Sequence, residues 1–139
     1  MTQPLAPPLT HLMSFSVEVG DVSAIVDGTP GRRFVPIRGG EITGRLTGRI
    51  LEGGGDWQTV RADGTIDLEA HYIIELDGHG CVEVSASGVR CATADGIYFR
   101  TSMRFSTEAP GLAWLSRRLF LSTGRREASN VALDIFEVG

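Results

Sequence analysis

The chain alternates apolar and polar residues along most of its length, and glycine-containing turns interrupt the alternation about every ten residues. This period places every second side chain on the same face of a strand, and apolar residues at helical spacing are nearly absent. From Phe15 onward the pattern indicates about eight or nine strands, a number that suits closure of a sheet on itself. The sequence therefore predicts an all-β fold, a single antiparallel closed β-barrel.

Several strands can be placed individually. The clearest is residues 41–51, in which Ile42, Leu46 and Ile50 share one face with two glycines. Other strands are expected at residues 66–75, 81–86, 89–92, 97–105 and 129–138, with chain reversals at Asp77-Gly78, Ser87-Gly88 and Asp95-Gly96. The alternation fails at residues 110–118, which are expected to form a short helical cap over one mouth of the barrel.

The length of 139 residues suffices for one core without disulfides or a structural metal. Residues 1–12 include three prolines and are expected to form a flexible leader, followed by a single barrel domain at 13–139. The formal net charge of −4 argues against a nucleic-acid partner, because phosphate binding needs a basic face. The arginine pairs at 32–33, 117–118 and 125–126 are interpreted as solvated positions.

No apolar run approaches the ~20 residues of a membrane-spanning helix, so no membrane partner is expected. The two cysteines, Cys81 and Cys91, do not form a Cys-x-x-Cys motif. If they flank a hairpin at Ser87-Gly88, they are too far apart to form a disulfide without rearrangement. Reduced thiols and a cytoplasmic location are therefore expected.

The segment 53–58 is the richest candidate for chemistry, because three glycines precede Asp56 and Trp57. It lacks the Gly-Lys-Ser/Thr ending of a phosphate loop. Asp56 is a candidate general base, although an aspartate after glycines can also cap its own turn. Trp57 can stack on a ligand or close the barrel end as part of the core. Arg61 can anchor an anionic oxygen or pair with Asp56 or Asp63.

Tyr72 falls on the otherwise aliphatic face of its strand, so its hydroxyl needs a partner inside the barrel or at its rim. A phenol there can donate a hydrogen bond to a substrate carbonyl or act as a general acid. A satisfied core tyrosine is the alternative. Thr101 and Met103, on an apolar strand face, and Trp114, in the expected cap, are candidate ligand contacts.

The histidines do not indicate a catalytic base or a metal site. His11 lies in the expected leader, His71 on a polar strand face and His79 in a turn. Glu69 shares a face with His71 and could seed a metal site, but a cluster of His and carboxylates at metal-ligand spacing is missing. No metal and no cofactor are predicted, and there is no Ser-His-Asp order with a nucleophile elbow.

Residues spread over the chain resemble the DUF3237 family, also called the UPF0311 proteins. The resemblance rests on Gly39-Gly40, Gly44, Gly48, residues 53–58, Arg61, Asp63-Gly64, Tyr72, Asp77-Gly78, residues 98–101, Pro110, Trp114-Leu115 and Gly124-Arg125. It implies a small β-barrel similar to those of allene oxide cyclases and dirigent proteins, with no settled catalytic residues. His71 departs from the family pattern, which often has arginine before the tyrosine, and this weakens a cationic role there.

Two functions are compatible with these features. The first is a barrel that binds a small apolar or aromatic oxygenated metabolite, with cofactor-free cyclase, isomerase or lyase chemistry; Tyr72 would be the acid or oxyanion donor, Asp56 the base and Arg61 the anion anchor. The second is a non-catalytic module with a filled barrel that forms a homo-oligomer through an outer face carrying Tyr98, Arg100 and Arg104. An interior pocket of about 300 Å³ or more would favour the first function, and a solid interior would exclude it.

Overall fold

The computed structural model describes residues 2–139, which form ten β-strands and one short 3₁₀-helix. The strands are β1 (Leu9–Val19), β2 (Ser23–Val26), β3 (Gly31–Gly44), β4 (Gly48–Ile50), β5 (Gly55–Val60), β6 (Ile66–Leu76), β7 (Gly80–Thr93), β8 (Gly96–Ser106), β9 (Phe120–Glu127) and β10 (Asn130–Val138). The helix, η1 (Ala113–Arg117), lies between β8 and β9 in the chain.

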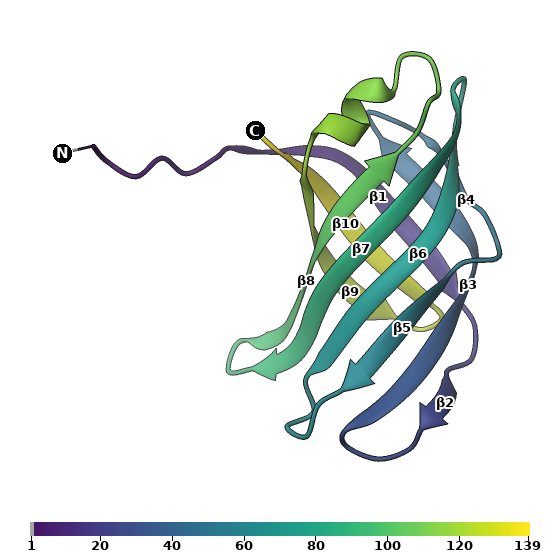
Figure 1. Cartoon of the computed structure of the whole chain (residues 1–139), viewed down its shortest axis with the longest axis vertical. Coiled ribbons are helices and arrows are strands. Elements are labelled where there is room, and N and C mark those ends of the chain that lie inside the picture. Colours follow the sequence, from purple (N-terminus) through teal and green to yellow (C-terminus); the bar gives the residue numbers. More distant parts are fainter. Residues whose placement is uncertain (1) are drawn as a thin grey trace.

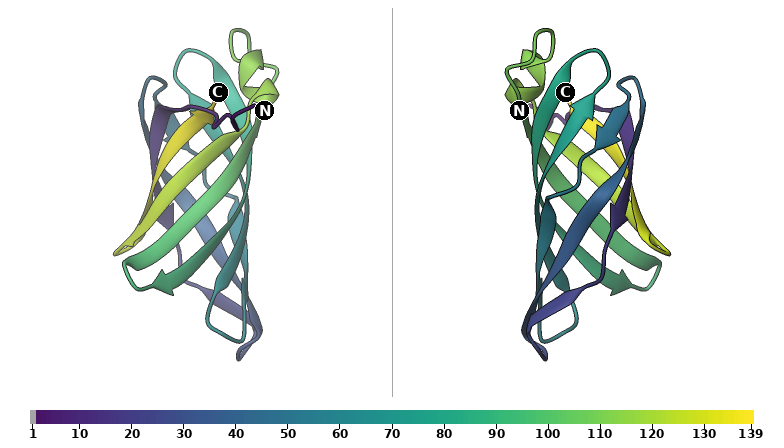
Figure 2. Two further views of the ribbon diagram at one scale, coloured as in Figure 1. Left: turned by 90° about the vertical axis from the view of Figure 1, so that its left-hand side faces the viewer. Right: turned by 90° about the vertical axis from the view of Figure 1, so that its right-hand side faces the viewer.

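These strands form one antiparallel sheet that closes on itself (Figures 1 and 2). Neighbours follow the chain from β6 to β10, β10 pairs with β1, and β1 pairs with β3. Between β3 and β6, the short strands β4 and β5 fill one position of the ring, because each pairs with both neighbours. β2 pairs only with β3, outside the ring. The predicted antiparallel closed barrel is confirmed.

The segment 41–51, predicted to be one strand, is instead a hairpin. Its first part ends β3 and its last part is β4, and Ile42 lies opposite Gly48 across the turn. Gly44 adopts a φ of +122°, which side-chain-bearing residues rarely adopt, and the chain turns after it. The apolar alternation keeps the same phase on both sides of this turn, so the sequence pattern did not reveal the break.

The predicted reversal at Ser87-Gly88 is also wrong, because β7 is continuous and pairs with β6 along most of its length. Gly88 lies opposite Thr101, and a Cβ atom there would come within 2.6 Å of Thr101 Cγ2. The glycine therefore allows close packing between strands and does not mark a turn. Cys81 and Cys91 lie on this same strand and are free thiols.

The two ends of the barrel differ. η1 and the β6–β7 turn lie at one end with both termini, and the β5–β6 and β7–β8 turns lie at the other (Figure 1). Leu112 and Leu115 of the cap are 1% and 0% exposed, which confirms the expected helical cap. Beneath it, large buried side chains such as Phe105, Phe120 and Leu76 fill the interior. We call this part the packed half.

β1 begins at Leu9, ahead of Met13, where the barrel was expected to begin. Leu12 is buried, and the ring of His11, expected in the leader, lies 5.4 Å from the ring of Phe136. Residues 9–12 therefore belong to the barrel wall. Residue 1 of the expected leader lies outside the described residues. In residues 2–139 there is no helix with the length and apolar character needed to cross a membrane.

Candidate functional site

A cavity of about 80 Å³ lies in the half of the barrel away from η1, which we call the hollow half. Its walls are inward-facing side chains of β1, β3 and β5 to β10. Small residues such as Val17, Ala70 and Ala86 line it together with a few larger ones, whereas the packed half is filled by phenylalanine, leucine and methionine. The expected volume of about 300 Å³ is not reached, but the interior is not solid. The cavity has room for a small ligand or a few water molecules.

The barrel wall is incomplete between β8 and β9 in the hollow half. The pairing of these strands extends only from Met103 and Phe120 to Arg100 and Thr123. Beyond that point the β7–β8 and β9–β10 turns stand apart (Figure 1). Arg126 lines the cavity from this part of β9 and is itself exposed, so the cavity meets solvent here.

Asp56 is held by a chain of polar contacts from β3 and β5. Arg33 Nε donates to Gln58 Oε1 at 2.6 Å, and Gln58 Nε2 donates to Asp56 Oδ2 at 2.7 Å. The backbone N–H of Glu69 donates to Asp56 Oδ1 at 3.1 Å. Both carboxylate oxygens therefore accept hydrogen bonds, and the carboxylate has a fixed orientation in the cavity wall.

Tyr72 lies at the boundary between the two halves, with its ring edge-on to Phe15 at 6.4 Å. It is 3% exposed, and its hydroxyl has no hydrogen-bond partner among residues 2–139. Burial, and to a smaller extent the charge of Asp56, raises the pKa of this phenol. Gly54 allows the close approach, because a Cβ atom there would overlap the Tyr72 Cβ. Tyr72 is therefore a protonated donor without an acceptor.

Burial also raises the pKa of the Asp56 carboxyl, against the opposing effects of the Gln58 and Glu69 hydrogen bonds and of Arg33. The folded state thus holds this proton more tightly than the unfolded chain does. The stability from this group is complete below the ordinary carboxyl pKa and is lost as pH rises through the folded pKa. A carboxyl with a raised pKa is also a stronger proton acceptor once ionised.

Replacing Asp56 by Asn removes this titration. We expect the free energy of unfolding of Asp56→Asn, relative to the unmodified protein, to rise as pH increases above about 4, on top of a constant offset. Asp67→Asn is the matched control. Arg61 lowers the pKa of Asp67, so that variant should lose relative stability only as pH rises toward about 4, and its difference should be flat above about pH 5, where Asp67 is ionised in both states. Urea unfolding at several pH values measures both trends, and a flat difference for Asp56→Asn would show that its pKa is not raised.

Two arginines and a hydroxyl pair complete the polar lining. Arg90, from β7, lines the cavity, and its buried Nε atom has no partner among the described residues. Arg126 enters from β9. Thr101 Oγ1 and Ser122 Oγ share a hydrogen bond of 2.5 Å across β8 and β9, which leaves Thr101 satisfied by a neighbour within the wall.

Three of the predicted site residues line the same cavity: Asp56, Tyr72 and Thr101. Their catalytic or binding roles stay predictions. Arg61 does not join them, because it is exposed and forms an ion pair with Asp67, with Nε donating to Oδ2 at 2.8 Å. The predicted anion anchor at Arg61 is therefore misplaced, and its partner is neither of the two aspartates considered from the sequence.

The two tryptophans and Met103 also lie away from the cavity. Trp57 is 46% exposed on the outer surface, where its ring lies 4.6 Å from that of Phe34. It faces outward because it alternates with the inward Asp56 on β5. Trp114 packs in the cap with its ring 6.4 Å from that of Phe120, and Met103 is buried in the packed half.

Four polar residues of the site were not predicted: Arg33, Gln58, Arg90 and Arg126. The alternation along β7 could have identified Arg90 as inward-facing. Arg90 falls in step with Val82, Val84 and Ala86 if the strand continues through Gly88. The incorrect turn at Ser87-Gly88 broke that phase. Arg33 and Arg126 were interpreted as solvated, because isolated arginine pairs in an acidic chain do not indicate a basic face.

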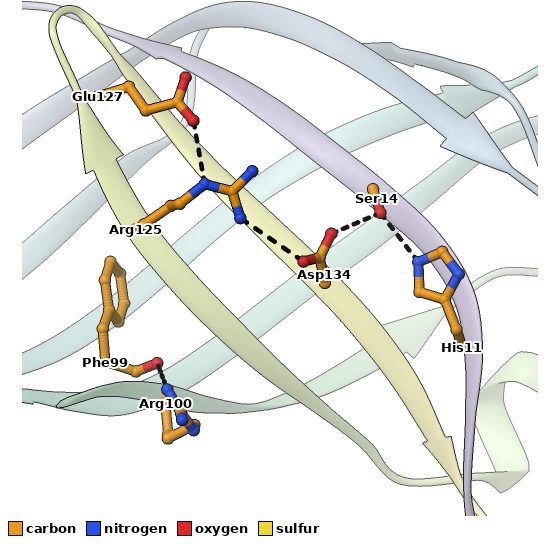
Figure 3. Close-up of polar contacts among 7 residues, drawn as sticks. All are labelled: His11, Ser14, Phe99, Arg100, Arg125, Glu127 and Asp134. Atoms are coloured by element: carbon orange, nitrogen blue, oxygen red, sulfur yellow. Dashed lines mark hydrogen bonds and ion pairs between the residues drawn. The ribbon is translucent and has the colours of Figure 1, made fainter. Parts of the chain in front are cut away.

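A second polar cluster lies on the outer wall, across β1, β9 and β10 (Figure 3). Ser14 Oγ donates to Asp134 Oδ1 at 2.7 Å and therefore accepts from His11 Nε2 at 2.9 Å. Arg125 bridges Asp134 and Glu127 at 3.7 and 3.1 Å. The serine proton points at the carboxylate and not at the imidazole, so this arrangement lacks the relay of a Ser-His-Asp triad.

His71 lies on the outer face of β6, where its Nε2 atom is 3.5 Å from Glu83 Oε1 on β7. Both side chains are more than half exposed. Within residues 2–139, no group of three or more His, Cys, Asp or Glu side chains is placed to hold a metal ion.

Comparisons with known proteins cover almost the whole chain. Residues 7–138 match the family model described as "Protein of unknown function (DUF3237)". A UPF0311 protein of Bradyrhizobium diazoefficiens is 34% identical over 143 residues, which span 92% of this chain and 94% of the relative.

Solved structures agree with the fold. A β-barrel-like protein from Acinetobacter baumannii AYE, 27% identical, superimposes with a TM-score of 0.92 over 100% of both chains. The crystal structure of an enzyme from Penicillium herquei has a TM-score of 0.83 over 100% of this chain and 99% of that chain. At 23% identity, the latter similarity establishes the shared fold alone.

Proposed function

We propose that this chain, which belongs to the DUF3237 (UPF0311) family, binds a small, largely apolar oxygenated metabolite in the hollow half of its barrel and rearranges it without a cofactor. The reaction class is that of an isomerase, cyclase or lyase that moves a proton beside a carbonyl group. One observation carries the proposal: the Asp56 carboxylate and the unpartnered Tyr72 hydroxyl line the same mostly apolar cavity.

The two groups supply complementary parts of such a reaction. The Asp56 carboxylate takes the proton from a carbon next to the substrate carbonyl, while the Tyr72 hydroxyl donates a hydrogen bond to the oxygen as it gains negative charge. The protonated Asp56 then returns the proton to a different carbon, so atoms and charge balance without an oxidant or reductant. Burial favours both roles, because it raises the pKa of Asp56 as a base and keeps Tyr72 protonated as a donor.

The surrounding residues support the roles of Asp56 as base and Tyr72 as hydrogen-bond donor. Gln58 and Arg33 fix the orientation of the Asp56 carboxylate. A base and a donor held in fixed positions lower the entropic cost of reaching the reactive geometry. The small volume points to a small substrate or to widening at the incomplete β8–β9 wall on binding. A barrel of the same shape occurs in the protein described as an enzyme from Penicillium herquei.

Replacing Tyr72 by Phe tests the role of the hydroxyl. Because that hydroxyl is buried without a partner, its removal should leave the free energy of unfolding unchanged or raise it by up to about 1 kcal/mol. Binding of acetophenone, a small aromatic ketone, should weaken by about five- to ten-fold, because its oxygen loses a donor. Titration followed by NMR measures the affinity, and solvent deuterium entering the acetophenone methyl group reports proton transfer.

The matched control is Tyr98→Phe, since Tyr98 is the other tyrosine of the chain and is 45% exposed on the outer wall. It should leave acetophenone binding unchanged. Equal affinity in Tyr72→Phe, or no binding of acetophenone at millimolar concentrations by the unmodified protein, would contradict the proposal.

The alternative function, an oligomerising module with a filled barrel, fits the hollow half less well. Its outer-face residues Tyr98 and Arg100 do lie together, with the guanidinium 5.1 Å from the ring centre. The homo-oligomer and the cytoplasmic location expected from the sequence stay predictions.

A further inference from the structure

The charge inside the barrel is opposite in sign to that of the whole chain. The chain has a formal net charge of −4, yet the residues that line the cavity include two arginines, Arg90 and Arg126, and a single carboxylate, Asp56. Arg33 adds a further positive charge behind Asp56, through its hydrogen bond to Gln58. The lining therefore has more positive than negative charge, which favours an anionic ligand.

Neither lining arginine has its charge satisfied by the protein. The ion pairs found among residues 2–139 involve other arginines or His71, and none includes Arg90 or Arg126. The Nε atom of Arg90 is buried without an acceptor. A buried guanidinium N–H without a partner is costly, so an arginine held in this way indicates an acceptor from outside the chain.

The arginines and the acid–base pair occupy different depths of the cavity. Arg90 lies opposite Ile66, the first residue of β6 after the β5–β6 turn. It is therefore near the end of the barrel away from η1, which we call the open end. Tyr72 lies six residues further along β6, at the boundary with the packed half. Arg126 lines the cavity beside the incomplete β8–β9 wall.

The lining between these two polar regions is mostly apolar, because its polar members there, Gln58 and Thr101, are hydrogen-bonded within the protein. Leu68, Ala70, Ala86, Phe99 and Leu133 line the cavity between the turns and Tyr72. A ligand that reaches both regions therefore needs an anionic group at one end, an apolar body, and a carbonyl or hydroxyl oxygen at the other end.

We infer that the ligand is a small organic acid, whose carboxylate binds Arg90 and Arg126 near the open end while a second oxygen reaches Tyr72. The inference rests on the proposed function, because it assigns the substrate class of the same cavity. Guanidinium groups suit this role, since their planar N–H donors match the two oxygens of a carboxylate. The buried Nε of Arg90 is shielded from water, which strengthens a charge-assisted hydrogen bond there, and Arg126 adds its charge from the solvent side.

The test compares two probes of the same shape, 4-acetylbenzoate and 4-acetylbenzamide, which differ in the charge of one end. We expect the acid to bind at least about ten-fold more tightly than the amide at low ionic strength and to lose much of this preference in high salt. Isothermal titration calorimetry or NMR titration gives both dissociation constants for the full-length protein.

Variants separate the inference from the proposed function. Arg90→Met and Arg126→Met should each reduce the preference for the acid by about three-fold or more, with Arg90→Met still folded because its buried Nε has no partner to lose. Tyr72→Phe should weaken both probes equally and leave the preference intact. Arg104→Met, an exposed arginine on the outer face of β8, should change nothing.

Each outcome decides one of the claims. Equal binding of the acid and the amide would overturn the inference and leave the proposed function standing. An acid preference that survives in both arginine variants would also overturn it. Failure of the unmodified protein to bind either probe would overturn both claims together. A preference that disappears in Arg90→Met and Arg126→Met but not in Arg104→Met would establish the organic-acid site.

Discussion

Phe120→Ala is expected to lower the free energy of unfolding by about 3–5 kcal/mol. Phe120 is fully buried in the packed half, where its ring packs edge-on against Phe105 at 4.9 Å and lies 6.4 Å from the Trp114 ring. Truncation leaves a void enclosed by these rings and by the cap. An apolar void of this kind stays empty, so the lost contacts are not replaced.

The matched control is Phe99→Ala in the hollow half. Phe99 is also buried, but it lines the existing cavity beside the incomplete β8–β9 wall. Its removal should enlarge a space that water can enter, so we expect a loss at least about 1 kcal/mol smaller than for Phe120→Ala. Urea or thermal unfolding measures both values. Equal losses would show that the two halves are packed alike and would remove the physical basis for a ligand site.

The alternation of the sequence predicted which side chains face inward wherever the strands were placed correctly. Tyr72 and Thr101 are inward and line the cavity for this reason. The prediction failed at two glycines, because a glycine within an alternating pattern can mark either the end of a strand or close packing inside one. Gly44 ends a strand, whereas Gly88 makes room for Thr101 inside one, and the local pattern is the same in both cases.

The site itself depends on closure of the barrel, which no local pattern contains. Arg33 and Gln58 lie opposite each other because β3 and β5 pair in this register. The side-chain amide of Gln58 then donates a hydrogen bond to the Asp56 carboxylate. The hollow half likewise results from side-chain volumes summed around the ring. Ala70 and Ala86 become neighbours only when β6 pairs with β7. The interior alternation could therefore be predicted, and the shape and charge of the cavity could not.

Gly40→Ala should have an effect of similar size, a loss of about 3–5 kcal/mol, because it acts where the barrel closes. Gly40 lies opposite Val17 of β1 and Ile50 of β4. Its φ of +148° disfavours a side chain, and a Cβ atom would overlap the Ser16 carbonyl oxygen and come within 2.9 Å of Ile50 Cδ1. Backbone strain and overlap therefore add, and the β1–β3 pairing must shift to relieve them.

Gly53→Ala separates the two contributions, since Gly53 has a φ of +122° but no atom within 4 Å of a Cβ placed there. It should cost about 1–2 kcal/mol, from strain alone. Val17 and Val19 of β1 and Val35 and Ile37 of β3 line the cavity on either side of the closing pairing, so Gly40→Ala should also weaken acetophenone binding. Equal unfolding free energies for the two variants would show that overlap at the closing strands contributes nothing, and unchanged acetophenone binding by Gly40→Ala would show that β1 and β3 can shift without disturbing the cavity.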